Sequence, residues 1–246
     1  MTWIEHWAWI IVCPIIAYFI GSIPFSYIIA RWRTGEDIRK SGTKNVGGLN
    51  VMIKAGYNWG IFAGFLDFFK GIVCLVSALV IPFNDIALAG TGDWEITQHQ
   101  LIYIFVAIAV ILGHNYPIYL NFQGGRGIAA IVAFLIITNP IILLIFIISM
   151  AIFMFITKTV RPAQFLAIFI GVPIAFFLNF YPPWITLANI DGRLSLGLFV
   201  LGISLAIFPK YVKSFIDLFK GKEYSLGKAG VVIPEELTSD EKDKFH

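Results

Sequence analysis

Charge is scarce in this sequence. Lys, Arg, Asp and Glu together make up 13% of its 246 residues, whereas a soluble globular domain carries roughly a quarter. Hydrophobic residues make up 58%, and the mean hydropathy is +0.81. Several apolar stretches approach the roughly 18–20 residues that span a bilayer. The composition therefore excludes an ordinary soluble domain and predicts an all-α polytopic membrane protein.

Cysteine is also rare, because only Cys13 and Cys74 occur, and both lie inside predicted membrane spans. Cysteines in such positions are more often small apolar fillers than partners in a disulfide. No group of Cys, His, Asp or Glu has the spacing of metal ligands. The sequence also lacks a Walker phosphate-binding motif and a Gly-x-Ser-x-Gly nucleophile motif. We therefore expect no metal and no other cofactor, and no nucleic acid as a partner.

The basic residues are confined to a few segments, and this distribution predicts the topology. Six lie between positions 31 and 54, one lies within 121–127, two lie within 158–161, and seven follow position 209. By the positive-inside rule, these segments face the cytoplasm. Segment 82–100 contains acidic residues but no Lys or Arg, so we expect it on the outer side.

Both ends of the apolar run 128–157 carry cytoplasmic signals, so this run is predicted to cross the membrane twice. The turn is expected at Thr138-Asn139-Pro140, because Asn-Pro favours a turn and disfavours a helix interior. We therefore expect seven transmembrane helices, with the N-terminus outside and the C-terminus in the cytoplasm. Residues 1–222 should form one membrane domain, and residues 223–246 a polar cytoplasmic tail. The expected spans are about 7–30, 56–81, 101–118, 128–138, 141–157, 163–181 and 194–211.

Three segments on the predicted cytoplasmic side are suited to anions. The first, Thr34–Asn50, mixes basic side chains with glycines, and amides exposed by glycine form anion-binding concavities. The second, Gly113–Gly127, ends in NFQGGRG and precedes a predicted helix whose N-terminal dipole favours an anion. The third, Tyr211–Glu223, follows the last span. The alternatives are a basic loop that contacts anionic lipids and, for the second segment, a flexible turn.

Asp67 and Lys70 are three residues apart within an apolar predicted span, so they share one helical face. Ionisable groups inside a membrane are costly and usually face a partner or a site. We interpret the pair as part of the site or as its support, and the alternative is a structural ion pair. His114, near the cytoplasmic end of the third span, is either a site residue or a hydrogen-bonded structural histidine.

Six motifs occur in order along the chain, namely GSIP (21–24), GEDIR (35–39), G-x-x-N-x-G-x-x-N (42–50), D-x-x-K-G (67–71), GHNYP (113–117) and F-x-G-G-x-G (122–127). Taken together, these motifs resemble those of the PlsY-type acyl-phosphate:glycerol-3-phosphate acyltransferases of bacterial membranes. They cover nearly all of the chain in order and spacing, which makes them far more specific than any single glycine motif. The resemblance implies seven spans with the N-terminus outside, in agreement with the topology expected from the basic residues.

The resemblance implies a reaction in which the 1-hydroxyl of glycerol 3-phosphate attacks the carbonyl of a fatty acyl phosphate. Inorganic phosphate leaves, and the product is 1-acylglycerol 3-phosphate (lysophosphatidate), the first intermediate of phospholipid synthesis. Because an acyl phosphate is already activated, the protein mainly has to position two anions and neutralise developing charge. The resemblance also implies a cell membrane location, with the active site facing the cytoplasm.

From the motifs and this resemblance we expect two sets of site residues. The first set would take part in catalysis and consists of Thr43, Lys44, Asn45, His114 and Glu223. The second set would bind substrate or phosphate and consists of Arg39, Gly42, Asn50, Lys70, Gly124, Gly125, Arg126 and Gly127.

The chain also departs from the pattern of the family it resembles. In the first motif, where that pattern has a serine, a glycine and an arginine, this chain has Thr43, Lys44 and Ile53. In the second, where the pattern has two lysines, this chain has Gln123 and Arg126. In the third, where the pattern has His, Asn and Arg, this chain has Tyr211, Ser214 and Asp217. These departures leave open a divergent paralogue with another phosphorylated acceptor, or a weakly active regulator. A transporter or flippase of anionic metabolites is the alternative from another class, although no internal repeat supports it.

Overall fold

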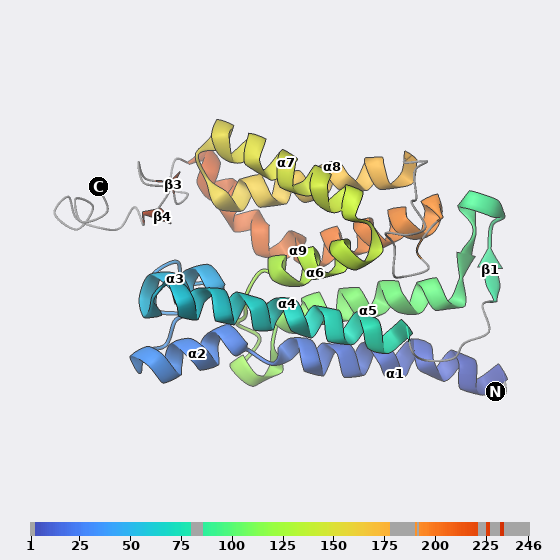
Figure 1. Cartoon of the computed structure of the whole chain (residues 1–246), viewed down its shortest axis with the longest axis horizontal. Coiled ribbons are helices and arrows are strands. Elements are labelled where there is room, and N and C mark those ends of the chain that lie inside the picture. The colour runs from blue at the N-terminus through green and yellow to red at the C-terminus, as the bar shows by residue number, and fades with distance from the viewer. Residues whose placement is uncertain are drawn as a thin grey trace.

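The computed structural model describes residues 3–79, 86–177, 190, 192–220, 225–226 and 232–233. These residues form nine α-helices, most of which lie lengthwise beside one another (Figure 1). The helices are α1 (Trp3–Ser22), α2 (Phe25–Thr34), α3 (Gly48–Ala55), α4 (Tyr57–Leu79), α5 (Gln98–Asn115), α6 (Ile128–Thr138), α7 (Pro140–Thr157), α8 (Val160–Phe177) and α9 (Arg193–Phe219). Shorter elements are β1 (Ala87–Ala89), η1 (Gly92–Trp94), β2 (Ile96–Thr97), η2 (Ile118–Leu120), β3 (Ser225–Leu226) and β4 (Val232–Ile233).

The helices pack in two layers with the short helix α6 between them (Figure 1). One layer holds α1, α4 and α5, and the other holds α7, α8 and α9. Helix α1 packs along α5, α4 packs on α6, and α5 joins the second layer through α9. The core between the layers contains the fully buried side chains of Tyr103, Phe134 and Phe199.

Six segments are helical, long and apolar enough to cross a membrane, and α6 is a shorter apolar helix. The six are Trp7–Thr34, Tyr57–Leu79, Gln98–Leu120, Pro140–Thr157, Val160–Phe177 and Arg193–Phe219. The all-helical membrane architecture expected from composition is therefore confirmed. Large apolar side chains such as Leu144, Ile148 and Phe155 of α7 are exposed, as expected for a helix that faces lipid.

The expected turn within the run 128–157 is confirmed. Helix α6 ends at Thr138, and α7 begins at Pro140, whose missing N–H costs nothing at the first helical position. The Asn139 side chain caps α7 by accepting hydrogen bonds from the N–H groups of Ile141 (3.0 Å) and Ile142 (3.1 Å). A local Asn-Pro signal therefore fixes this reversal of the chain.

Two expected boundaries were too short. The first span continues past position 30 to Thr34, with a break at Ile23-Pro24 between α1 and α2. The last helix continues past position 211 to Phe219, and it does so through Pro209. In both places the helix continues beyond its apolar part into a stretch that contains basic residues. The expected tail, 223–246, lies outside the described residues except for the paired strands β3 and β4.

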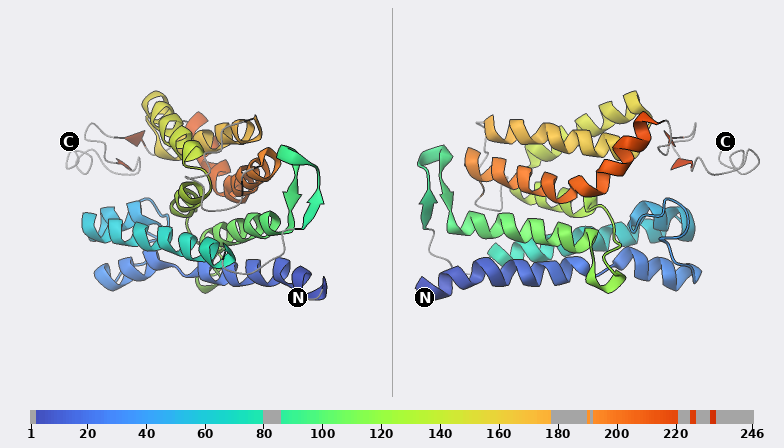
Figure 2. Two further views of the ribbon diagram at one scale, coloured as in Figure 1. Left: turned by 45° about the vertical axis from the view of Figure 1, so that its right-hand side comes forward. Right: turned by 180° about the vertical axis from the view of Figure 1, so that it is seen from behind.

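The segments expected on opposite sides of the membrane lie at opposite ends of the bundle. Helices α2 and α3, the α7–α8 connection and the end of α9 share one end, which we call the basic end (Figures 1 and 2). The β1–β2 hairpin and the start of α1 lie at the other end. The chain thus gathers its basic segments, which are distant in sequence, in one region.

Glycines allow α1 and α5 to approach closely beside the α1–α2 break. A Cβ at Gly21 would lie 2.8 Å from the Val110 Cα, and a Cβ at Gly113 would lie 2.8 Å from the Ser22 backbone nitrogen. Real Cβ atoms do not come this close to backbone, so neither position accepts a side chain without separating the helices. The GSIP and GHNYP motifs therefore meet at this helix crossing.

Candidate active site

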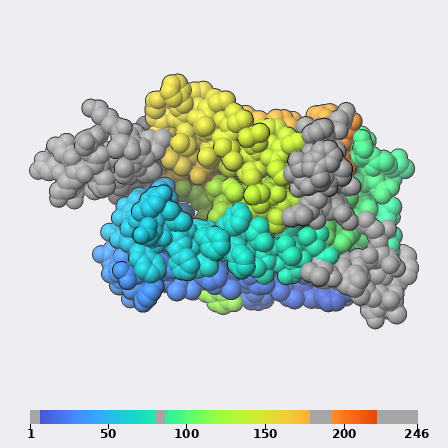
Figure 3. Space-filling model, viewed as in Figure 1, coloured from blue at the N-terminus to red at the C-terminus, as the bar shows by residue number. Residues whose placement is uncertain are grey.

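A pocket of about 350 Å³ lies near the basic end. It is formed by the loop before α3, by α3 and α4, by the end of α5 and by the first turns of α6 and α8. In Figure 3 the surface is hollowed between the cyan segment of α3 and α4 and the yellow segment of α7 and α8. The lining residues are Thr43, Asn45, Gly47, Gly48, Leu49, Met52, Gly60, Gly64, Asp67, His114, Arg126, Gly127, Ile128, Ala129, Val160, Arg161 and Gln164.

The buried Asn50 side chain holds the loop before α3 in shape. Its amide nitrogen donates to the carbonyl oxygens of Ile38 (2.9 Å), Ser41 (3.1 Å) and Asn45 (3.0 Å). Its Oδ1 accepts from the N–H of Thr43 at 2.9 Å. One side-chain amide therefore satisfies several backbone groups of the loop at once. Asn50 thus supports the loop from within and is not among the lining residues.

The loop brings two of its three expected catalytic residues to the pocket. Thr43 and Asn45 line it, whereas Lys44 between them does not. Lys44 has a left-handed backbone with φ of 56°, and Gly42 has φ of 58°. A Cβ at Gly42 would also collide with the Asn50 side chain. The left-handed turn at these two positions therefore depends on the glycine.

Arg39 lies outside the lining and is bound within the protein. Its guanidinium pairs with Asp37 at 2.7 Å, donates to the Leu120 carbonyl at 3.2 Å and lies over the Tyr27 ring. The hydrogen bonds from Arg39 lower the pKa of Asp37 to about 2, and the same bonds raise the pKa of Arg39. Both groups are therefore charged at neutral pH, and Arg39 joins the loop to η2.

Gly124 and Gly125 pack tightly against the end of α5. The N–H of Gly124 donates to the Asn115 carbonyl at 3.1 Å, and the N–H of Gly125 donates to the His114 carbonyl at 3.0 Å. A Cβ at Gly125 would collide with the His114 ring and the Val46 carbonyl. The sequence predicts that these two glycines cradle phosphate, whereas in the structure their N–H groups donate to carbonyls of α5. Their glycines allow the close packing of this stretch on α5.

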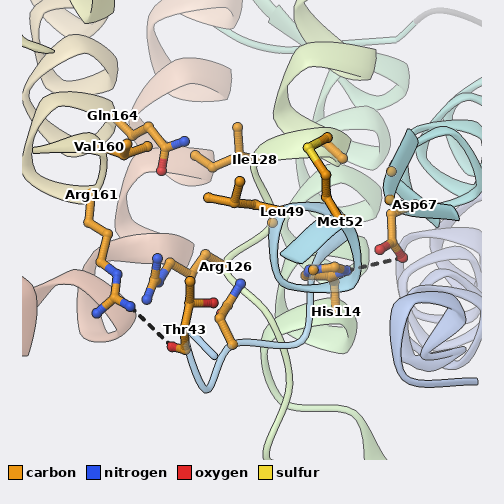
Figure 4. Close-up of a pocket in the computed structure, with 17 residues that line it drawn as sticks. Thr43, Leu49, Met52, Asp67, His114, Arg126, Ile128, Val160, Arg161 and Gln164 are labelled. Carbon is orange, nitrogen blue, oxygen red and sulfur yellow. Dashed lines mark hydrogen bonds and ion pairs between the residues drawn. The ribbon is translucent and has the colours of Figure 1, made fainter. Parts of the chain in front are cut away.

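The buried charges form a network beside the pocket. Asp67 pairs with Lys70 at 2.9 Å and accepts a hydrogen bond from the Ser26 hydroxyl at 2.7 Å. The His114 Nδ1 lies 3.5 Å from the same carboxylate (Figure 4), and Lys70 donates to the Ile23 carbonyl at 3.0 Å. Asp67 and His114 line the pocket and Lys70 does not. Lys70 thus connects α4 to the α1–α2 break, where the Ile23 carbonyl also accepts from the N–H of Phe25 at 3.1 Å.

Two arginines from distant segments meet at the other side of the pocket. Arg126 comes from the glycine stretch before α6, and Arg161 comes from the first turn of α8 (Figure 4). The Arg126 guanidinium lies 5.8 Å from the centre of the Tyr211 ring. Arg161 donates to the Thr43 carbonyl at 3.1 Å. We expected Arg126 here from the sequence, but Arg161 contributed only to the predicted topology.

The third segment expected at the site, Tyr211–Glu223, begins within α9. Tyr211 is fully buried, and its hydroxyl donates to Oε1 of Gln164, a lining residue, at 3.1 Å. Ser214 is buried and Asp217 is half-buried on the same helix. Glu223, the remaining expected catalytic residue, lies outside the described part of the chain.

Among the described residues, no group of three or more His, Cys, Asp or Glu side chains could hold a metal ion. The pocket instead combines arginine, hydroxyl and amide groups with apolar walls from Leu49, Met52, Ile128 and Val160. Guanidinium groups bind phosphate through charge-assisted hydrogen bonds. Such a pocket can hold an anion that carries an apolar chain beside a smaller anion.

The comparison with known proteins agrees with this chemistry. Residues 11–221 match the family model described as glycerol-3-phosphate acyltransferase. A protein of Acholeplasma laidlawii with that name is 34% identical over 225 residues, which cover 89% of this chain and 94% of the relative. Glycerol-3-phosphate acyltransferase 2 of Thermotoga maritima is 32% identical over 168 residues, which cover 68% of this chain and 78% of the relative.

The fold is also similar to a solved structure. The crystal structure of PlsY, an integral membrane glycerol 3-phosphate acyltransferase, in its glycerol 3-phosphate form superposes with a TM-score of 0.70. The two chains are 25% identical, and the match covers 89% of this chain and 96% of PlsY. The family match, the identity of the relatives and the common fold together show that this chain belongs to the glycerol-3-phosphate acyltransferase family.

Proposed function

We propose that this protein transfers a fatty acyl group from an acyl phosphate to the 1-hydroxyl of glycerol 3-phosphate. The hydroxyl oxygen forms an ester bond with the acyl carbon, the bond from that carbon to the phosphate oxygen breaks, and the hydroxyl proton ends on the departing phosphate. The products are 1-acylglycerol 3-phosphate and inorganic phosphate. The observation that carries the proposal is the pair of guanidinium groups, Arg126 and Arg161, in one half-apolar pocket.

The pocket can supply what this reaction needs. An acyl phosphate is already activated, so catalysis depends mainly on positioning the two reactants and on stabilising developing negative charge. Thr43, Asn45 and His114 place a hydroxyl, an amide and an imidazole in the same pocket as the guanidinium groups. We assign substrate contact to these three residues, to Arg126 and to Gly127.

The proposed orientation places the basic end in the cytoplasm, the N-terminus outside and the protein in the cell membrane. The gathering of basic segments at that end supports it. Helix α6, with 11 residues, is about 16 Å long, roughly half of the hydrocarbon thickness. It is largely buried by its neighbours, so it can act as the seventh crossing without facing lipid along its length.

The direct test supplies purified protein with a long-chain acyl phosphate and glycerol 3-phosphate. We expect inorganic phosphate and 1-acylglycerol 3-phosphate to form in equal amounts. A panel of other phosphorylated acceptors tests the divergent paralogue, and uptake of labelled glycerol 3-phosphate into sealed vesicles tests a transporter. Uptake without product, or product from another acceptor alone, would contradict the proposal.

Arg126→Ala is expected to lower kcat/KM for acyl transfer at least about tenfold, because one charge-assisted contact to phosphate is lost. Steady-state kinetics with each substrate varied in turn measure the effect. Arg31→Ala is the matched control, because Arg31 donates to the Gly35 carbonyl on the exposed surface at the end of α2. Equal turnover in the two variants would show that Arg126 does not bind the substrate phosphate.

A further inference from the structure

We propose that Arg161 is a second phosphate-binding residue and that it receives the phosphate of glycerol 3-phosphate. The proposal rests on the function proposed above and extends it to a residue outside all of the expected motifs. Arg161 lies in the first turn of α8, and its side chain reaches across to the loop before α3, where it lies beside Arg126 (Figure 4).

The charge of the reactants requires a second cation. A phosphate monoester carries about −1.5 to −2 charges at neutral pH, so two phosphorylated substrates bring roughly three to four negative charges into one pocket. Among the lining residues described, Arg126 and Arg161 are those with a permanent positive charge. The nearby Lys70 is already paired with Asp67 at 2.9 Å. One guanidinium for each phosphate is therefore the arrangement that the pocket can offer.

Arg161 is held in position by the protein itself. Its Nη2 donates to the Thr43 carbonyl at 3.1 Å. Thr43 is in turn fixed through its own N–H, which donates to Asn50 at 2.9 Å. A guanidinium held in this way loses little rotamer freedom when it binds a phosphate.

The position of Arg161 favours the smaller substrate. The polar loop that Arg161 contacts brings Thr43 and Asn45 to the pocket, and a glycerol backbone needs such hydroxyl and amide partners. Arg126 instead precedes the apolar residues Ile128 and Ala129 at the start of α6, which suit a substrate with an acyl chain. We therefore assign the acceptor phosphate to Arg161 and the donor phosphate to Arg126.

The test compares Arg161→Ala and Arg161→Lys with Lys158→Ala in the purified full-length protein. Lys158 is a matched control, because it is a cation three residues away whose ammonium lies over the Phe155 ring. We expect Arg161→Ala to raise KM for glycerol 3-phosphate at least about tenfold and KM for acyl phosphate less than about threefold. Lysine should restore part of the effect, and Lys158→Ala should behave as wild type.

A rise in KM for acyl phosphate alone would overturn the assignment to the acceptor, and no rise in either KM would overturn phosphate binding. A binding measurement tests the role of Arg161 independently of turnover. Glycerol 3-phosphate should raise the melting temperature of the wild type and of Lys158→Ala, but not that of Arg161→Ala. If the wild type forms no product, the proposed function fails while this binding result still decides the role of Arg161. If glycerol 3-phosphate still raises the melting temperature of Arg161→Ala, phosphate binding by Arg161 is refuted.

Discussion

Replacing Gly125 by alanine is expected to lower acyl transfer about a hundredfold or more. A Cβ at this position would collide with the His114 ring and with the Val46 carbonyl. The stretch that carries Gly125 must then withdraw from α5 and from the loop before α3, and Arg126 is the next residue along it. A displacement of about 1 Å in a positioning group can cost about 10²-fold in rate. Steady-state kinetics, with kcat and both KM values, measure the loss.

The control for this prediction is Gly171→Ala in α8. A Cβ there would lie 3.6 Å from the nearest atom, a Val200 methyl carbon, which is an ordinary contact. Alanine in a helix interior is also more favourable than glycine by about 1 kcal/mol, so this variant should keep its activity and should not unfold at a lower temperature than the wild type. Thermal unfolding of both variants distinguishes a displaced loop from an unfolded protein. Wild-type turnover in a folded Gly125→Ala variant would show that the contact with His114 does not position Arg126.

The helical architecture was predictable because its signals are local. The length of the apolar runs identified most spans, and Asn139-Pro140 identified the reversal between α6 and α7. The helix ends at the basic end were not predictable in the same way. Arg33 lies in the last turn of α2, and its guanidinium lies 4.6 Å from the centre of the Trp59 ring on α4, so this contact connects two helices. Basic residues that mark the end of a span in sequence thus extend a helix in the structure.

The site was only partly predictable, because the role of a residue depends on partners distant in sequence. The clusters of glycine and basic residues predict a common site for Thr43 and Arg126, and both residues line one pocket. The sequence does not show that the amides of Gly124 and Gly125 are used by carbonyls of α5. The sequence does not point to Arg161, because a single arginine beside a short connection has no motif around it. Its place in the pocket lining and its contact with the Thr43 carbonyl depend on the fold.

Removing the Asp67 carboxylate alone is expected to destabilise the protein by about 3–5 kcal/mol, the typical cost of leaving one charge of a buried pair without its partner. Asp67 and Lys70 have side chains that are 3% and 2% exposed, and their charged atoms lie 2.9 Å apart. In Asp67→Asn the Lys70 ammonium stays buried and keeps only the Ile23 carbonyl as a described hydrogen-bond acceptor. Thermal unfolding in detergent should therefore show a much lower melting temperature than that of the wild type.

The double variant Asp67→Asn/Lys70→Met is the matched control, because it removes both charges and keeps an unbranched chain of similar length at position 70. Replacing both partners of a buried pair is often close to neutral, so most of the lost stability should return. Activity should not return with it, because His114 would still lack the carboxylate that lies 3.5 Å from its Nδ1 in the pocket wall. If Asp67→Asn unfolds at the wild-type temperature, the pair does not stabilise the α1–α2 break. If the double variant regains full turnover, the network is structural only, and His114 does not depend on Asp67.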